Sequence, residues 1–254
     1  YECHICEKEI IMTTEVENVL NSIKTEFIPA LQESFGQDLK AVILYGSAAR
    51  DSYIKGVSDV NLLVLTGSPH PDLIMQLGKK SAKLIQKHRL SLHFLTESEF
   101  LNSSDVFPME YYDIKQDHVL LWGEDPLAKL SLTPQNLRHQ VEERLRGSVN
   151  ALRQALLASQ GKNKPLAEVL INWYGSQAAL FRGVLRLLDR GDIPNEAHQL
   201  IKTVAEAFEI DSSGMEELVA LRESRKAEEA SAVAVNVLGF LTALTRKIDA
   251  MEKS

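Results

Sequence analysis

Residues 44–65 read LYGSAARDSYIKGVSDVNLLVL, in which two apolar runs flank a polar connection. The first run begins upstream and covers residues 41–45, and it ends at a glycine as a buried strand that meets a tight turn does. The second run covers residues 60–65 and is closed by a Gly-Ser-Pro sequence. The pattern therefore predicts two short buried strands joined by a turn and a loop.

The turn carries the residue types that hold a phosphate. Gly46 has no Cβ to block a close approach, and Ser47 adds a hydroxyl donor to the backbone amides of the turn and of the helix expected after it. Asp59 and Asn61 open the second strand. Because side chains two apart on a strand share a face, we expect both to point toward the Gly46–Ser47 turn.

The rest of the first half alternates between helical and strand patterns. Apolar residues at helical spacing predict helices over 16–31 and 73–84, and apolar runs predict strands over 90–95 and 118–123. This order implies an α/β domain with a mixed sheet, which we place at residues 13–129.

The second half contains helical patterns without a strand signal. Apolar residues three or four apart form stripes over 137–156 and 166–188. Three shorter stripes follow, over 201–208, 215–221 and 230–248. We therefore expect an all-α antiparallel helical bundle over 130–254, so that the fold class is α/β followed by all-α.

The charge balance narrows the range of partners. Lys and Arg number 28 against 35 Asp and Glu, a net charge of −7, which argues against a general binder of duplex nucleic acid. The longest apolar stretch, residues 230–244, is interrupted by polar residues and falls short of the ~18 apolar residues of a membrane span. We expect a buried helix there, no membrane partner and, without a secretory signal pattern, a cytoplasmic location.

The two cysteines, Cys3 and Cys6, lie close together near the start of the sequence. A zinc site needs four ligands, and no second cysteine pair lies nearby to complete it. We interpret residues 1–12 as an N-terminal tail, and metal binding by the two cysteines stays an open alternative.

Residues 44–65 resemble the signature of the DNA polymerase β-like nucleotidyltransferase superfamily. There Gly-Ser is followed about a dozen residues later by Asp-x-Asp at the head of a strand. Among its members the chain is similar in style to aminoglycoside nucleotidyltransferases and to small nucleotidyltransferases of toxin–antitoxin pairs, which have or partner helical bundles. Residues 107–115 and 119–126 also resemble the linker of bacterial proteins with this domain.

The resemblance implies a chemistry and assigns residues to it. In this superfamily two Mg²⁺ ions held by carboxylates clamp a nucleoside triphosphate such as ATP, and an acceptor hydroxyl displaces pyrophosphate. Carried over, Gly46, Ser47 and Arg50 contact the nucleotide, while Asp59 is the first metal ligand and a catalytic acid.

The sequence departs from the superfamily at the other acids. Asn61 stands at the second acidic position and offers Mg²⁺ a carbonyl oxygen without a charge. On the 90–95 strand the positions of correct parity are Ser91 and His93, neither acidic. We treat Asn61 and His93 as degenerate catalytic positions, with Asn61 also a metal ligand. Two alternative sources of charge follow the strand, Glu97 and Glu99.

Three functions follow. We expect a nucleotide-binding member of the superfamily whose transfer of a nucleoside monophosphate to a hydroxyl is weak or absent. The first alternative is an active Mg²⁺-dependent enzyme acting on a small-molecule or protein acceptor. The second is a toxin–antitoxin-like regulatory module, for which the nearest Arg and His pair in the bundle is Arg190 and His198, with seven residues between them. The acceptor is not recorded in any short motif, and the apolar final helix would suit a homodimer.

Overall fold

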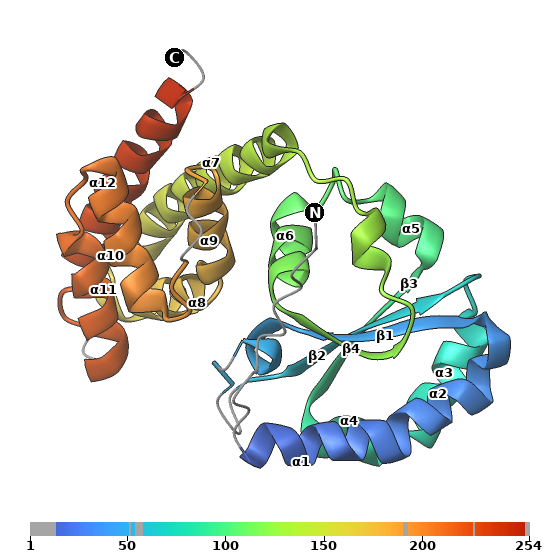
Figure 1. The fold of residues 1–254 in the computed structure, drawn as a ribbon. Helices are drawn as coiled ribbons and strands as arrows, with labels where there is room; N and C mark the ends of the chain where they lie inside the picture. Colours follow the sequence, from blue (N-terminus) through green and yellow to red (C-terminus); the bar gives the residue numbers. More distant parts are fainter. Residues whose placement is uncertain (1–13, 51, 54–57, 190–192, 226, 252–254) are drawn as a thin grey trace. The chain divides into compact units, whose positions relative to one another are not determined.

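A computed structural model describes residues 14–50, 52–53, 58–189, 193–225 and 227–251 (Figure 1). The chain divides into two compact units. The sheet unit comprises residues 1–104 and 111–131, and the helical unit comprises residues 105–110 and 132–254. Residues 105–110 therefore belong to the helical unit, although residues on both sides of this segment belong to the sheet unit.

A four-stranded mixed sheet organises the first unit, as the sequence predicts. Its strands are β1 (Leu39–Tyr45), β2 (Val60–Thr66), β3 (Leu90–Thr96) and β4 (His118–Gly123), in the order β3-β2-β1-β4. β1 pairs antiparallel with both β2 and β4, whereas β2 and β3 run parallel. The carboxyl end of β1 therefore lies beside the amino ends of β2 and β3.

One face of the sheet is covered by the helices that precede and follow the first two strands (Figure 1). Helix α1 (Thr14–Ser22), a π-helical turn η1 (Ile23–Phe27) and α2 (Ile28–Phe35) form one continuous helical segment. The predicted 73–84 helix is two helices, α3 (Pro71–Lys80) and α4 (Ala82–His88), because the chain breaks at the buried Ser81. Apolar side chains of this segment and of the sheet share one core.

The opposite face carries shorter elements. Helix α5 (Glu97–Asn102) follows β3, and η4 (Pro126–Lys129) follows β4. Phe100 of α5 stacks on Tyr111, with 4.8 Å between ring centroids. Tyr111 belongs to α6 (Pro108–Gln116), a helix that begins in the segment grouped with the helical unit and continues into the sheet unit.

The described part of the helical unit contains helices and no strand, in agreement with the expected bundle. Helix α7 (Pro134–Ser159) is followed by α8 (Asn163–Gly175) and α9 (Ala178–Arg186), and then by α10 (Ala197–Phe208), α11 (Ser213–Ser224) and α12 (Ala230–Ala250). The stripe over 166–188 predicted one helix but belongs to two, because the chain turns at residues 176–177 while the apolar spacing continues.

Helix α12 is the one described helix that by length and composition could cross a membrane. One of its faces is buried, with Val237, Leu241, Leu244 and Ile248 fully inaccessible to solvent. It packs on α7, α8 and α11, so it is a core helix of the helical unit, as the sequence predicts for this stretch.

Two glycines give opposite expectations for substitution by alanine. At Gly123 φ is +87°, and an added Cβ would clash with the Lys40 carbonyl oxygen, so Gly123→Ala should destabilise the sheet unit by about 2–4 kcal/mol. At Gly147, inside α7, an added Cβ meets nothing within 4 Å, so Gly147→Ala should stabilise the helical unit by about 1 kcal/mol. Urea denaturation followed by circular dichroism measures both changes. If Gly123→Ala leaves the free energy of unfolding unchanged, the positive φ at the end of β4 is contradicted.

Candidate functional site

The Gly46–Ser47 turn directly follows β1. Gly46 has φ of +80°, a left-handed conformation that suits glycine, and the chain then makes one 3₁₀ turn, η3 (Gly46–Ala49). The backbone amides of Arg50 and Ser52 both donate to the Ser47 carbonyl oxygen at 3.2 Å. The expectation of a regular helix directly after the turn is therefore wrong, because the described chain is helical only over the 3₁₀ turn Gly46–Ala49. A phosphate here would depend on the amides and hydroxyl of the turn rather than on a helix dipole.

Asn61 lies against this turn, as the sequence predicts. The β1–β2 register pairs Tyr45 with Asn61, which places the Asn61 side chain beside the residue that follows Tyr45. A Cβ added to Gly46 would lie 2.6 Å from the Asn61 amide nitrogen. The absence of a side chain at position 46 thus lets the Asn61 amide approach the backbone of the turn.

Asp59 comes immediately before β2 and is held by an arginine. Its Oδ1 atom accepts from both Nε and Nη2 of Arg89 at 2.9 Å. Arg89 precedes β3, and its carbonyl oxygen accepts from the Val60 amide at 3.0 Å, so the same residue fixes the starts of both strands. Both side chains of the ion pair are about half exposed, at 48% for Arg89 and 54% for Asp59. Sequence reasoning missed Arg89, whose nearness to Asp59 depends on the β2–β3 pairing.

The other polar side chains described on the sheet face that carries Asn61 end in hydroxyl groups or imidazole rings. The parallel register places Ser91 directly beside Asn61 and His93 beside Leu63. The exposed His93 ring meets the Tyr45 ring edge to face, with 6.3 Å between centroids. Across β1, His118 pairs with Tyr45, and its Nε2 lies 3.3 Å from Asp125 Oδ2. The buried Nδ1 of His118 has no hydrogen-bond partner.

Glu97 and Glu99 do not supply the missing charge. They follow the last residue of β3, whereas Asn61 and Ser91 lie near the first residues of β2 and β3, roughly 20 Å away along the strands. Glu99 closes a capping box with Thr96, whose backbone amide and hydroxyl donate to it and lower the pKa of its carboxyl. Glu97 pairs with Lys129 at 2.9 Å. The alternative that either acid reaches the site is wrong.

Arg50 is turned toward α6. Its Nη1 atom lies 3.1 Å from Asp113 Oδ2, and the two side chains are only 10% and 14% exposed. This nearly buried ion pair ties the end of the turn to α6. No local signal in the sequence marks Asp113 as a partner of Arg50, because the two residues are 63 positions apart.

Among the described residues, the donor set around the turn does not fit a pair of Mg²⁺ ions. Mg²⁺ prefers carboxylate oxygens, and Asp59, the carboxylate that the superfamily resemblance assigns to the metal, is already paired with a guanidinium. Within the described ranges no cluster of three His, Cys, Asp or Glu residues could hold a metal ion. Cys3, Cys6 and Arg190 lie outside the described residues.

Comparisons with known proteins agree with the geometry. Residues 24–121 match the family described as Nucleotidyltransferase domain. A segment of 49 residues, 19% of this chain, is 45% identical to a candidate protein adenylyltransferase of Methanocaldococcus jannaschii, and the match spans about a third (33%) of that relative. The fold is similar to that of a spectinomycin adenyltransferase from Enterococcus faecialis solved with ATP and spectinomycin, with a TM-score of 0.52 and 15% identity over 93% of this chain and 99% of the other.

The two arginines of the site should differ in their effect on stability. Arg50→Gln breaks a nearly buried ion pair and should lower the free energy of unfolding by about 3 kcal/mol, while Arg89→Gln breaks a half-exposed pair and should cost under about 1 kcal/mol. Urea denaturation compares the two variants. If Arg50→Gln leaves stability unchanged but weakens ATP binding, Arg50 is a nucleotide ligand, as the superfamily resemblance implies, and its structural role is minor.

Proposed function

We propose that this chain binds a nucleoside triphosphate at the Gly46–Ser47 turn. The proposal starts from the premise that residues 24–121 are a nucleotidyltransferase domain of the DNA polymerase β-like superfamily. We further propose that it transfers a nucleoside monophosphate weakly or not at all. The Gly46 geometry carries the first part and the depleted set of acids carries the second.

Support for binding comes from the groups that the turn leaves open. The Ser47 hydroxyl has no hydrogen-bond partner among the described residues and is half-buried. Gly46 keeps the backbone clear of a Cβ, and the Asn61 amide beside it adds donors suited to phosphate oxygens. None of these groups depends on a bound metal.

Support for weak transfer comes from the charge at the same place. Where the two-metal reaction needs several carboxylates, this site has Asp59 paired with Arg89, the neutral Asn61 and the imidazole of His93. A neutral amide and a softer nitrogen ligand hold Mg²⁺ poorly. We therefore derive no catalytic step through a metal.

ATP is the nucleotide that we propose. Both similar proteins are described as adenylyl-transferring, and one of them was solved with ATP. The acceptor, if transfer occurs, would be a hydroxyl of a small molecule or a protein. Calorimetric titration with each nucleoside triphosphate, with and without Mg²⁺, tests the proposal directly. Binding that is strongest for ATP and little changed by Mg²⁺ is the expected result.

Substitutions at the turn should weaken ATP binding, and Gly46→Val should abolish it. Gly46→Val places a branched side chain against the Asn61 amide at a left-handed φ and blocks the approach of a phosphate. Ser47→Ala removes one hydroxyl without backbone strain and should weaken binding about tenfold, as expected for a hydrogen bond to a charged group. Circular dichroism confirms folding of both variants. ATP binding by folded Gly46→Val and Ser47→Ala proteins at the parent affinity would place the nucleotide elsewhere.

Restoring acids should create activity. Asn61→Asp together with His93→Glu adds two carboxylates to the sheet face on which Asn61 and His93 lie. We expect pyrophosphate release from ATP in Mg²⁺ to rise at least about tenfold, which corresponds to a barrier lower by about 1.4 kcal/mol. Glu97→Gln, at the far end of β3, is the matched control and should change nothing. Brisk release by the parent that Asp59→Asn abolishes would instead show an active enzyme.

A further inference from the structure

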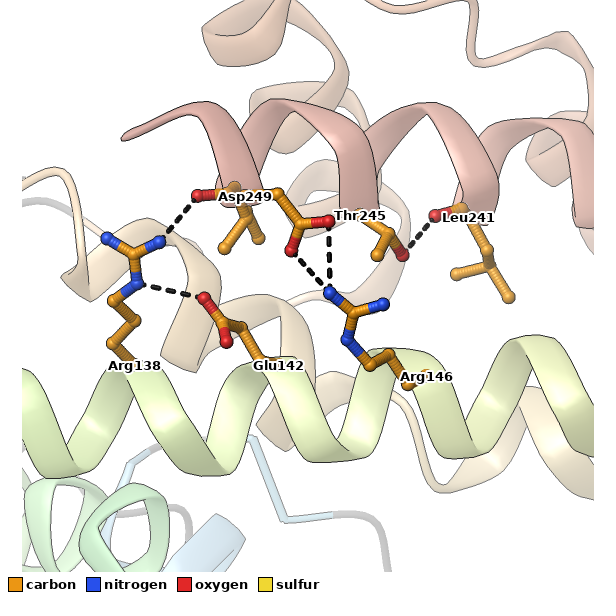
Figure 2. Close-up of polar contacts among 7 residues, drawn as sticks. Arg138, Glu142, Arg146, Leu241, Thr245 and Asp249 are labelled. Atoms are coloured by element: carbon orange, nitrogen blue, oxygen red, sulfur yellow. Dashed lines mark hydrogen bonds and ion pairs between the residues drawn. The ribbon is translucent and has the colours of Figure 1, made fainter. Parts of the chain in front are cut away.

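Arginines concentrate along the seam between α7 and α12 of the helical unit (Figure 2). Arg138 donates through Nε to Glu142 at 2.9 Å and through Nη2 to the Ile248 carbonyl oxygen at 3.0 Å. Arg146 Nη2 contacts both oxygens of Asp249, at 2.8 and 3.0 Å. These contacts join α7 to the C-terminal turns of α12, where the helix dipole favours positive charge.

Next to the Arg146–Asp249 pair the seam opens into a cavity of about 300 Å³. Arg146 and Arg153 line it from α7, seven residues apart and therefore on one helix face. Arg246 lines it from α12, and its remaining polar lining consists of Thr242, Thr245 and Asp249. The two threonine hydroxyls already donate to carbonyl oxygens one turn back, so they present acceptor lone pairs and no free proton.

The cavity holds more positive charge than its own residues neutralise. Its lining has three guanidinium groups and one carboxylate, and that carboxylate is bound to Arg146. Arg153 and Arg246 have no ion-pair or hydrogen-bond partner among the described residues. Both guanidinium groups are exposed and line the same cavity, so its lining carries a net positive charge, although the chain as a whole carries a net charge of −7.

We propose that this α7–α12 cavity binds the dianionic phosphate group of a small molecule. A phosphate dianion matches the two uncompensated charges, and its oxygens accept the parallel N–H bonds that a guanidinium fork donates. A cavity of this size on an acidic chain suits a compact phosphorylated ligand rather than a nucleic acid strand, which needs a continuous basic track. The site lies wholly in the helical unit and is independent of the nucleotide proposed at Gly46.

Calorimetric titration of the whole chain with inorganic phosphate and with pyrophosphate, at fixed ionic strength, tests the proposal. The double variant Arg153→Gln with Arg246→Gln should weaken binding of both anions at least about tenfold. Neither side chain anchors a helix, so the variant should melt at the parent temperature. A charge-matched control, Arg225→Gln with Lys247→Gln, removes two exposed cations that do not line the cavity and should stay within about twofold of the parent.

The outcomes separate this site from the alternatives. Equal losses in the cavity and control variants would show a bulk effect of net charge and overturn the proposal. Unchanged phosphate and pyrophosphate binding in the cavity variant, with loss in folded Gly46→Val, would place the anion at the sheet unit instead. A single-stranded oligonucleotide that the parent binds more tightly than pyrophosphate, and that the cavity variant releases, would identify nucleic acid as the ligand and also overturn it.

Discussion

The pairing of β1 with β2, in the register that sets Tyr45 opposite Asn61, is the constraint on which the candidate site depends. It brings the end of the first strand and the start of the second together, so that a turn and a strand 15 residues apart share one corner of the sheet. The parallel pairing of β2 with β3 then adds Ser91 and His93 to the same corner. The same pairing places the acids that follow β3 at the opposite end of the sheet, where Glu99 caps the start of α5 and Glu97 forms an ion pair with Lys129.

Among the described residues, charge at this corner is balanced by ion pairs between side chains. Asp59 and Arg89 neutralise each other, and Arg50 is neutralised by Asp113. A triphosphate arriving at the turn would therefore meet dipolar donors rather than an excess of fixed charge. Such donors can orient a nucleotide, because hydrogen bonds to charged oxygens are directional. They offer little to an attacking oxygen and a leaving pyrophosphate, both of which need concentrated positive charge in the transition state.

Most of the fold could be predicted from local sequence, and the failures share a cause. The strands, the Gly-Ser turn and the facing Asn61 follow from alternation and spacing, which are local properties. The breaks at Ser81 and at residues 176–177 could not be predicted, because apolar spacing continues across them. The Arg50–Asp113 pair and the grouping of residues 105–110 with the helical unit depend on contacts between distant segments, which no local pattern records.

The arginines of α7 illustrate the same limit for function. In the sequence Arg138, Arg146 and Arg153 are equivalent, each a charged residue on the polar side of a long helix. Packing against α12 distinguishes them: Arg138 and Arg146 bind groups near the end of α12, whereas the exposed Arg153 lines the cavity together with Arg246. Exposed ion pairs contribute little to stability, so the packing of α7 on α12 does not require a further cation at either position. The apolar face of α12 already supplies that packing, which leaves Arg153 and Arg246 available for an anion from solution.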